Sequence, residues 1–537
     1  MRSLLLLLGQ LLLADGMCTC QGDPTCWCWN NCTQTLDAAC GGRPRDAAKP
    51  GLDPSAACLA CAGRSQAELV ESGCSPDQVE TFCAKRKRPA FQVFWNSPMP
   101  FCCSMPMKPV PDFVAFNITM NLGPYYPKLK NICGEGTVEK PCFNGPEIMS
   151  MYKEETGAYP EYQSGKPING GLPQLVNLTK YVEGWRQNII DGIPDSTGGP
   201  IVGLDWESWR PTWSENANRP GGEPDQDVDQ IQSIALVKRQ HPDWTDSAKI
   251  EAEAKRQFNA GAKAFYTAAF QEAQKLRPNA LWGAYDTNHC GTYACSDTNY
   301  WQWTKNVQAS GDRPKTNLST TRPAAVCPVP NINDELGWLW VLIDVLEPTI
   351  YQSTNSPAVT RSIIDCSLGE ARRVATMARK LRGGKRIPVV PYQEIEWNAC
   401  TTDCKFLNKT ALYDTLTYAA LKYGIDGLYL WGGGGRECIP ANCNGTGSCT
   451  ADRCDKDASL GTYLNTILGP AVKGAVTLAS LCSDTWCGGH GRCWDCPEPF
   501  GPVSFGQCKC DCDDGFPGCA KSKMMMANGT AAPNVTY

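Results

Sequence analysis

The residues best suited to chemistry lie in one stretch, residues 200–213, which reads PIVGLDWESWRPTW. Its first half is apolar, as expected of a strand covered on both faces, and it leads into Asp205 and Glu207. Side chains on a strand repeat every two residues, so these carboxyl groups point to the same side, within about 7 Å of each other. The pattern predicts a buried strand that ends in a pair of acids.

Two carboxyl groups at that spacing cannot ionise independently, so one of them is expected to have a raised pKa. An acid that keeps its proton near neutral or mildly acidic pH can donate it to a substrate. Trp206, Trp209 and Trp213 add apolar surface, which favours a raised pKa and offers flat faces to a sugar ring. The alternative interpretation is a surface strand end with two solvated acids, whose tryptophans belong to the core.

Strand-like and helix-like segments alternate around this stretch. Repeated strand-then-helix units indicate an α/β fold with a parallel sheet, and over roughly 380 residues they favour a closed (β/α) barrel. Strands are expected at 90–95, 281–285, 349–351, 387–392 and 427–431, and helices at 247–276, 335–346, 361–381 and 411–422.

In such barrels the chemistry lies at the C-terminal ends of the strands. Asp205, Glu207, Tyr285, Tyr351 and Trp431 all fall at those ends. Tyrosine and tryptophan also fill barrel cores, but their recurrence beside an acid pair favours a carbohydrate cleft. Glycoside hydrolysis is therefore the leading hypothesis.

Other classes of function find little support. The net charge of −5 and the single short basic run at 85–88 argue against a nucleic-acid partner. The sequence contains three histidines and no Gly-x-Ser-x-Gly, His-Glu-x-x-His or phosphate-loop motif. We therefore expect neither a serine hydrolase nor a metal or other cofactor. The glycines at 432–435 favour a flexible loop over an anion cradle.

The N-terminus is typical of a secreted protein. Residues 1–16 have one positive charge, a short leucine run and small residues, as in a signal peptide. The 32 cysteines fit an oxidising compartment, and no later segment predicts a membrane span or lipid anchor. We expect a secreted or lysosomal glycoprotein, with glycans at Asn31, Asn117, Asn177, Asn317, Asn408 and Asn444.

Composition divides the mature chain into four parts. Residues 17–88 form a cysteine-rich module of unreadable role, in which a zinc site at Cys58 and Cys61 is disfavoured because no histidine lies nearby. Residues 89–478 form the catalytic domain. Residues 479–520 crowd eight cysteines into an EGF-like module, and 521–537 are expected to be a disordered tail.

The sequence resembles the hyaluronidases, glycoside hydrolases with a TIM-like (β/α) barrel of seven to eight strands. The resemblance rests on many motifs in order over about residues 89 to 520 and includes the EGF-like string. The motifs are GLDWESWRPTW from Gly203, FWN at 94–96, GGLPQ at 170–174, HPDW at 241–244, NDELGWLW at 333–340, PTIY at 348–351, PY at 391–392 and LW at 430–431.

The resemblance implies a role for each site residue. Glu207 would donate a proton to the glycosidic oxygen, while the N-acetyl oxygen of the substrate attacks the anomeric carbon. Asp205 would stabilise the positive charge on the acetamide, Tyr351 would hydrogen-bond it, and Tyr285 and Trp431 would shape its pocket. Arg210 would pair with a carboxylate or the substrate. Trp206, Asn96 and Asn398 complete the expected substrate contacts.

The resemblance also implies disulfide bonds. Family spacing pairs Cys482 with Cys493, Cys487 with Cys508 and Cys510 with Cys519, which leaves Cys496 and Cys512 as an extra bond. It also pairs Cys290 with Cys327, and Cys102 or Cys103 with Cys454.

The chain departs from the family at several places. The N-terminal module has no counterpart, and cysteine-bearing inserts lie along the barrel. His289 and Asn398 replace acids that are frequent in vertebrate members, so the pH optimum is left open. Glycines after Trp431 replace a more aromatic segment.

We therefore expect a monomeric endo-β-N-acetylhexosaminidase that hydrolyses hyaluronan, with chondroitin as a further substrate. The alternatives are a chondroitin-specific hydrolase and a catalytically inactive glycosaminoglycan-binding protein.

Overall fold

The computed structural model describes residues 90–96, 113–121, 144–145, 147–196, 198–216, 228–286, 330–352, 357–397, 405–432, 460–514, 516 and 518–519. The chain divides into two compact units, Met1–Lys87 and Arg88–Tyr537, and all described residues belong to the second. The expectations for the signal peptide, the cysteine-rich module and the tail lie outside the described residues.

One group of parallel strands is built around β1 (Gln92–Trp95). This strand pairs with β2 (Ile118–Thr119) on one side and β11 (Gly427–Trp431) on the other, and β11 pairs with β8 (Tyr392–Glu394). The apolar run that predicts β1 is buried from Val93 to Trp95, which is why it serves as a central strand.

A second parallel group has β6 (Ile201–Asp205) at its centre, between β3 (Ile148–Tyr152) and β7 (Leu281–Ala284). The chain at 345–350 connects the two groups, because it makes parallel bridges to both. Tyr285 bridges to Glu347, Leu346 to Val389 and Thr349 to Tyr392.

A side chain links the remaining edges of the two groups. Asn121, two residues beyond β2, donates its amide to the carbonyl of Ile148 at 2.9 Å. Its side-chain oxygen accepts from the backbone nitrogens of Glu147 and Ile148, at 3.0 Å each. Eight parallel segments thus follow one another edge to edge, and side chains from most of them share one buried cluster: Phe94, Ile148, Ile201, Val345, Val390, Tyr392 and Tyr429.

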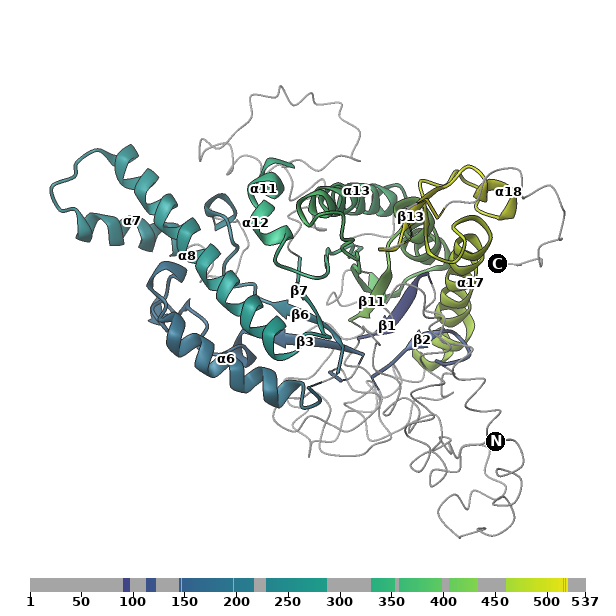
Figure 1. Ribbon diagram of the computed structural model, residues 1–537, viewed down its shortest axis with the longest axis horizontal. Helices are drawn as coiled ribbons and strands as arrows, with labels where there is room; N and C mark the ends of the chain where they lie inside the picture. Colours follow the sequence, from purple (N-terminus) through teal and green to yellow (C-terminus); the bar gives the residue numbers. More distant parts are fainter. Residues whose placement is uncertain are drawn as a thin grey trace, which may run out of the picture. The chain divides into compact units, whose positions relative to one another are not determined.

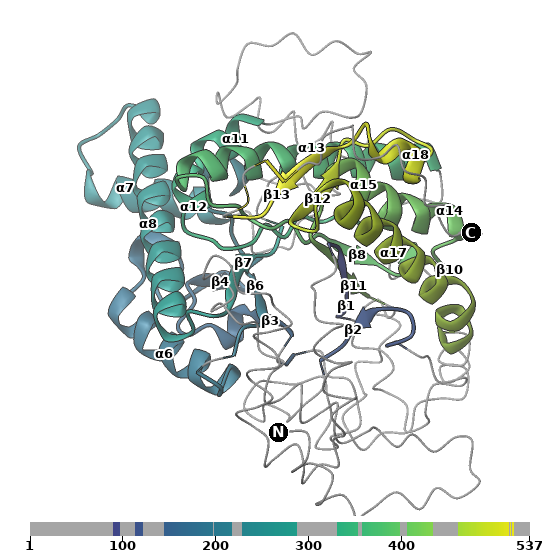
Figure 2. The ribbon, with the colours of Figure 1, turned by 45° about the vertical axis from the view of Figure 1, so that its right-hand side comes forward.

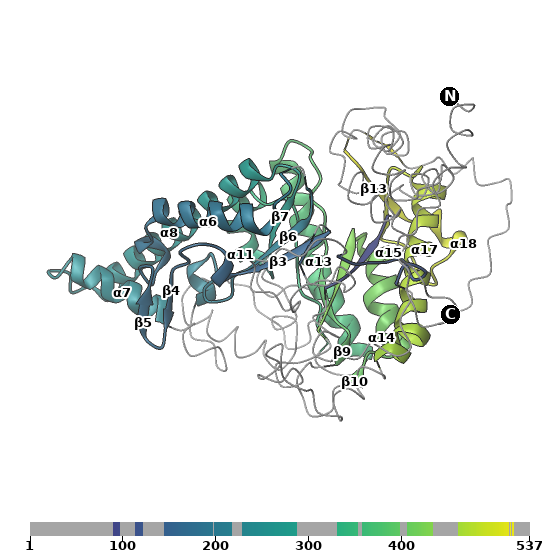
Figure 3. The ribbon, with the colours of Figure 1, turned by 90° about the horizontal axis from the view of Figure 1, so that it is seen from below.

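Helices cover the strands on their outer side. α6 (Leu178–Gly192) and α8 (Ser247–Leu276) lie beside β3, β6 and β7, and α7 (Val228–Gln240) packs against α8 farther from the strands (Figures 1 and 3). α13 (Pro357–Leu381), α15 (Ala419–Tyr423) and α17 (Gly469–Trp486) lie on the side of β1 and β11 (Figure 2).

The expected helix at 247–276 is confirmed as α8 with the same bounds. The carboxylate of Asp246 caps its first turn by accepting from the backbone nitrogens of Ala248 and Lys249. It ends at Leu276, two residues before Pro278, as expected of a helix that a proline stops. Its apolar face, which includes Phe258 and Phe265, is buried.

The expected helix at 335–346 is wrong over its second half. α11 (Pro330–Glu335) and α12 (Gly337–Trp340) are short, and the chain then extends to make the bridges of residues 345–350. Val341, Ile343 and Val345 are β-branched, which favours the extended form. Pairing with β7 and with the chain before β8 therefore overrides the helical pattern.

The expected strand at 387–392 is displaced towards its C-terminus. Bridges occur at Val389 and Tyr392, but β8 itself begins at Tyr392. Pro388 and Pro391 lack the N–H that a regular ladder needs, so the strand forms only after them. The expected helix at 411–422 is present as α14 (Lys409–Leu412), a π-helical turn (Tyr413–Tyr418) and α15.

Several short elements complete the described chain. They are β4 (Glu161–Gln163), β5 (Lys166–Ile168), β9 (Glu396–Trp397), β10 (Lys405–Phe406), α18 (Pro502–Phe505), 3₁₀ turns at Lys153–Glu155, Pro173–Leu175 and Trp213–Asn216, and a π turn at Leu464–Leu468.

One described helix, Leu460–Trp486, has the length and composition to cross a membrane. Half of its most apolar stretch is buried inside the protein, and the part that forms α17 contacts β1 and β2. Packing against the strands therefore accounts for its apolar character, and the structure offers no further support for a membrane span.

The C-terminal residues form a small disulfide-bonded module. β12 (Gly491–Trp494) pairs with β13 (Lys509–Cys512) in antiparallel fashion, with Cys493 opposite Cys510. The expected bond between Cys482 and Cys493 is confirmed. The three other pairs differ from expectation: Cys487 bonds Cys510, Cys496 bonds Cys508, and Cys512 bonds Cys519.

The expected bonds of Cys487 to Cys508, Cys510 to Cys519 and Cys496 to Cys512 are therefore wrong. The strand register explains the change, because Cys510 lies opposite Cys493 and the sulfur of Cys487 is 3.6 Å from that of Cys493. Cys290, Cys327, Cys102, Cys103 and Cys454 lie outside the described residues.

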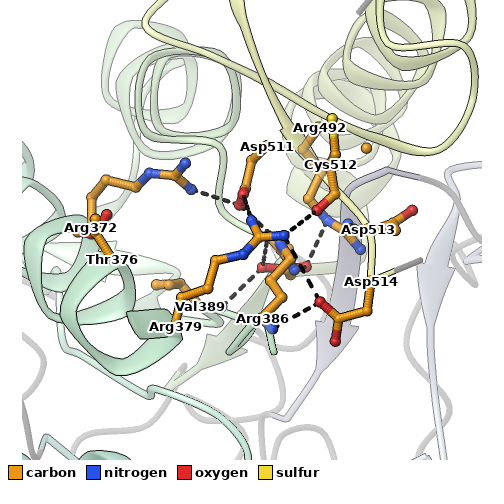
Figure 4. A network of polar contacts seen from close by, with 12 residues as sticks. Arg372, Thr376, Arg379, Arg386, Val389, Arg492, Asp511, Cys512, Asp513 and Asp514 are labelled. Carbon is orange, nitrogen blue, oxygen red and sulfur yellow. Dashed lines mark hydrogen bonds and ion pairs between the residues drawn. The ribbon is translucent and has the colours of Figure 1, made fainter. Parts of the chain in front are cut away.

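An arginine–aspartate cluster joins the module to the rest of the fold. Asp511 of β13 accepts hydrogen bonds from Arg372 (2.8 Å) and Arg379 (2.9 Å), both on α13, and from Arg386 (2.8 Å) (Figure 4). Arg386 also donates two bonds to Asp426, just before β11. Hydrogen bonds between charged side chains thus hold together α13, the start of β11 and β13.

The cluster keeps its aspartates ionised. Burial by itself would raise the pKa of Asp511, but Arg386 and Arg372 outweigh it and hold the pKa well below its usual range. Burial likewise opposes ionisation of Asp426, and Arg386 and Arg492 lower its pKa. Folded-state values below the unfolded value of about 4 mean that this stabilisation is complete above about pH 4 and is lost as pH falls further.

Arg386→Met tests the cluster. We expect the free energy of unfolding at pH 6 to fall by about 3–5 kcal/mol, because two enclosed carboxylates lose a shared counter-ion. Urea denaturation followed by tryptophan fluorescence measures this, and the loss should narrow below about pH 4. Arg256→Met, on the exposed surface of α8, is the control and should change little. Equal losses in both variants would contradict the proposed importance of the cluster.

Candidate active site

β6 places the two acids in different surroundings. The strand is buried from Ile201 to Leu204 and paired on both sides. Asp205 is its last residue and is partly buried, whereas Glu207 is exposed to solvent. The predicted buried strand leading to an acid pair is therefore confirmed, with one partly buried acid and one exposed acid.

Asp205 is the acid whose proton affinity is altered. Burial raises its pKa well above the usual value, and the negative charge of Glu207 raises it further. Arg210 acts in the opposite direction, while Glu347 and Asp286 also raise it. The raised pKa expected of one member of the pair therefore falls on Asp205.

The three tryptophans of the motif belong to the core. Trp206, Trp209 and Trp213 are each 1–2% exposed, and the rings of Trp206 and Trp209 pack against Phe265 and Tyr266 of α8. The expectation that Trp206 offers a flat face to a sugar is wrong. Trp206 lies one position along from Asp205, so the alternation of side chains turns it towards the helices.

Residues 153–161, which we call the anchoring segment, hold the chain on both sides of Glu207. Lys153 donates to Glu161 at 2.6 Å and to the Ser208 hydroxyl at 3.1 Å. Ser208 donates in turn to the same oxygen of Glu161 at 2.7 Å. The residue directly after Glu207 is thus fixed by a carboxylate and a cation.

Neighbouring side chains add to this attachment. The indole of Trp206 donates to the Thr156 hydroxyl at 2.9 Å, and that of Trp209 donates to the Pro160 carbonyl at 2.8 Å. Glu207 therefore lies between two residues, Trp206 and Ser208, that are each bonded to the anchoring segment. Such attachment limits the positions that the Glu207 carboxyl can adopt.

Arg210 continues the polar surroundings of the acids. Its guanidinium lies 3.6 Å from the carboxylate of Asp286, which follows β7. The expected carboxylate partner of Arg210 is therefore Asp286. Burial alone would lower the pKa of Arg210, but Asp286, Glu207 and Glu215 outweigh it, so the guanidinium stays charged.

Two tyrosine hydroxyls meet at the ends of neighbouring strands. Tyr285 donates to the hydroxyl of Tyr351 at 3.3 Å. Burial raises the pKa of both phenols, so both keep their protons near neutral pH and remain hydrogen-bond donors. Trp431, the last residue of β11, packs with both tyrosines against the shared buried cluster.

The sequence reasoning missed Glu347, which also lies among these groups. It is 1% exposed and accepts a hydrogen bond from the Tyr429 hydroxyl at 2.9 Å. A charged residue inside the otherwise apolar Val345-Leu346-Glu347-Pro348 could have signalled it. The signal was hidden because the residues before it read as a helix.

The remaining predicted residues are a substrate contact at Asn96, two positions near the site and the glycosylation sites. Asn96 is 1% exposed at the end of β1, and its expected substrate contact stays a prediction. Asn398 and His289 lie outside the described residues. Of the expected glycosylation sites, Asn117, Asn177 and Asn408 are exposed, and Asn31, Asn317 and Asn444 lie outside the described residues.

Within the described part of the chain, two cysteine groups are close enough to hold a metal: Cys482, Cys493 and Cys508, and Cys487, Cys510 and Cys519. All six are engaged in disulfides, which removes the thiolates that a metal would need. Around Asp205 and Glu207 the described side chains bring together two carboxyl groups, the guanidinium of Arg210 and the hydroxyls of Tyr285 and Tyr351.

Comparison with known proteins gives one consistent result. The family model of the hyaluronidases matches residues 83–497. Bovine and human hyaluronidase-1 are each 31% identical to the chain, over 65% of it and over 68% and 70% of their own lengths. Honeybee hyaluronidase is 29% identical over 62% of this chain and 74% of its own.

Solved structures agree. Crystal structures of bee venom hyaluronidase, one of them in complex with a hyaluronic acid tetramer, superpose with TM-scores of 0.51 and 0.52. They share 27% sequence identity with this chain, and the alignments cover 71–72% of it and 99% of theirs. The chain therefore belongs to the hyaluronidase family of glycoside hydrolases.

Proposed function

We propose that this protein is an endo-β-N-acetylhexosaminidase that hydrolyses hyaluronan. The observation that carries the proposal is the pairing of an enclosed Asp205 with an exposed Glu207 at the end of one buried strand. The bee venom relative crystallised with a hyaluronic acid tetramer, which supports hyaluronan as the substrate.

Glu207 is the proton donor. It is accessible to a substrate, and the attachment of Trp206 and Ser208 to the anchoring segment supports a fixed position for its carboxyl group. In the first step it protonates the glycosidic oxygen, the bond from that oxygen to the anomeric carbon breaks, and the leaving sugar departs as an alcohol.

The substrate supplies the nucleophile. The carbonyl oxygen of its N-acetyl group attacks the anomeric carbon and forms a cyclic oxazolinium ion, an exception to the usual two-carboxylate scheme. Water then attacks the same carbon while the Glu207 carboxylate takes its proton, so the configuration is retained. The substrate must therefore carry an N-acetylhexosamine at the cleaved bond.

Asp205 stabilises the positive charge on the acetamide, and the tyrosines hold that group. The Tyr351 hydroxyl accepts from Tyr285 at 3.3 Å, so its own proton can be donated to the acetamide, while Tyr285 shapes the pocket. Trp431 forms the wall of the pocket beside them. Arg210 is paired with Asp286, so its role is to balance the acids and not to bind the substrate directly.

We further propose that the eight parallel segments form a closed TIM-like (β/α) barrel and that the C-terminal module is EGF-like. The Asn121 bonds and the shared buried cluster support closure. The four disulfides and two antiparallel strands support the module, and they suit a secreted or lysosomal protein.

Glu207→Gln tests the assignment. We expect reducing-end release from hyaluronan to fall by about 100- to 10,000-fold while hyaluronan binding persists, because only the transferable proton is lost. Activity is measured from about pH 3.5 to 7.5, with unsulfated chondroitin in parallel. Wild type that binds hyaluronan but cleaves neither polymer would support the inactive binding protein, and cleavage of chondroitin alone would replace the proposed substrate.

Ser208→Ala tests the anchoring segment. Loss of the bond to Glu161 frees the chain beside Glu207, so we expect kcat on hyaluronan to fall by about ten- to a hundred-fold with little change in KM. Thr466→Ala, which removes an exposed hydroxyl bond within a distant helical turn, is the matched control. Unchanged kcat in the Ser208 variant would show that the attachment does not position the acid.

A further inference from the structure

Glu347 occupies the interior of the proposed barrel and not its rim. It lies in the extended chain that bridges to β7, and it is 1% exposed. One carboxyl oxygen accepts the Tyr429 hydroxyl at 2.9 Å, and the other accepts no hydrogen bond from the residues that the structure describes. The mechanism above makes no use of this enclosed acid.

Two glycines make room for the carboxyl group. A Cβ atom on Gly203 of β6 would come within 2.9 Å of the unpaired oxygen, and one on Gly283 of β7 within 2.6 Å. At these distances a side chain at either position would displace the Glu347 carboxyl group. The absence of side chains on both strands therefore accommodates the Glu347 carboxyl.

Gly203 connects Glu347 to the reacting end of the site. Gly203 and Asp205 are two residues apart on β6, so the Glu347 carboxyl lies on the face of the strand that carries Asp205. Among the described residues, one oxygen of Asp205 also lacks a hydrogen-bond donor. Two enclosed acids, each with an unsatisfied oxygen, therefore share one face of β6.

The described groups that face Glu347 are neutral, whereas those near Asp205 are charged. Tyr429 of β11 and Tyr392 of β8 face Glu347, and the Tyr392 hydroxyl in turn is 3.2 Å from that of Ser150 on β3. The charged groups near Asp205 are Glu207, Arg210 and Asp286. No described cation therefore lies against Glu347.

An acid enclosed without a cation resists ionisation. Burial raises the pKa of Glu347 to about 8, although the Tyr429 hydrogen bond lowers it in part. A negative charge on Glu347 raises the pKa of Asp205 in turn. The charge on one acid consequently depends on the proton held by the other.

We propose that Glu347 is a positioning residue of the reaction, whose enclosed carboxyl group acts through Asp205 and controls how readily Asp205 becomes the anion that stabilises the acetamide. This role rests on the proposed function, because it assumes that Asp205 must be ionised during turnover. It assigns a task to a carboxyl group that would otherwise only destabilise the interior.

Glu347→Gln tests the proposal through the pH dependence of kcat on hyaluronan. Glutamine keeps the size and a hydrogen-bond acceptor for Tyr429 but cannot ionise, so the pKa of Asp205 should fall. We expect the acid limb of the profile to move to lower pH by about one unit, with KM little changed. A profile that superimposes on the wild-type profile would overturn the role of Glu347.

A matched control separates this effect from burial alone. Asp229 of α7 is also buried, and burial raises its pKa to about 8. Asp229→Asn should leave the acid limb unchanged, although it alters the pH dependence of stability. The folded pKa values of Glu347 and Asp229 both lie above the unfolded values near 4. The free energy of unfolding should therefore fall as pH rises towards 8, and each amide variant should remove its acid's share of that pH dependence. Equal shifts of the limb in both variants would overturn the proposal.

A second variant tests the same role if Glu347→Gln does not fold. Tyr429→Phe removes the donor that favours the Glu347 anion, so Glu347 stays neutral to higher pH. The acid limb should then move in the same direction by a smaller amount, and movement to higher pH would contradict the proposal. Wild type without hydrolytic activity would defeat the proposed function itself, whereas active wild type with unmoved variants would defeat only the role of Glu347.

Discussion

The burial of Asp205 at the end of β6 is the constraint on which the site depends. A carboxyl group taken out of water loses solvation, and the protein can compensate with a cation, with hydrogen bonds or by keeping the proton. Arg210 supplies part of that compensation, but it is itself paired with Asp286. The remaining cost appears as the raised pKa of Asp205, which gives the site its capacity to hold and release charge.

Alternation along β6 separates chemistry from packing. Asp205 ends the strand on the side of the proposed site, while Trp206 faces α8 and contributes to an aromatic core with Phe265 and Tyr266. Because Trp206 and Trp209 also donate indole hydrogen bonds to the anchoring segment, the core fixes the same loop that carries Glu207. Packing on one side of the strand thus limits movement on the other.

Much of this fold was predictable from local pattern. The apolar runs of β1, β6 and β11, and the capped amphipathic helix α8, are recognised from the order of residues along each segment. β3 was missed because Ile-Met-Ser-Met-Tyr has weak strand character, and the chain at 341–346 was read as helix because its strand partners are far away in sequence.

The acids and tyrosines of the site were predictable because strand ends converge in a parallel fold. The anchoring segment was not, since Lys153 and Glu161 are about 50 residues from Ser208 in the chain and only the fold brings them together. Cysteine pairing failed for a related reason. Spacing identifies a disulfide-rich module, but the strand register chooses the partners.

The arginine–aspartate cluster has a consequence for synthesis. Arg372 and Asp511 are separated by 139 residues, so α13 leaves the ribosome long before its partner exists. Until β13 is made, the guanidinium groups of Arg372 and Arg379 lack their Asp511 partner. The final packing of α13 against the C-terminal module can therefore form only once β13 has been synthesised.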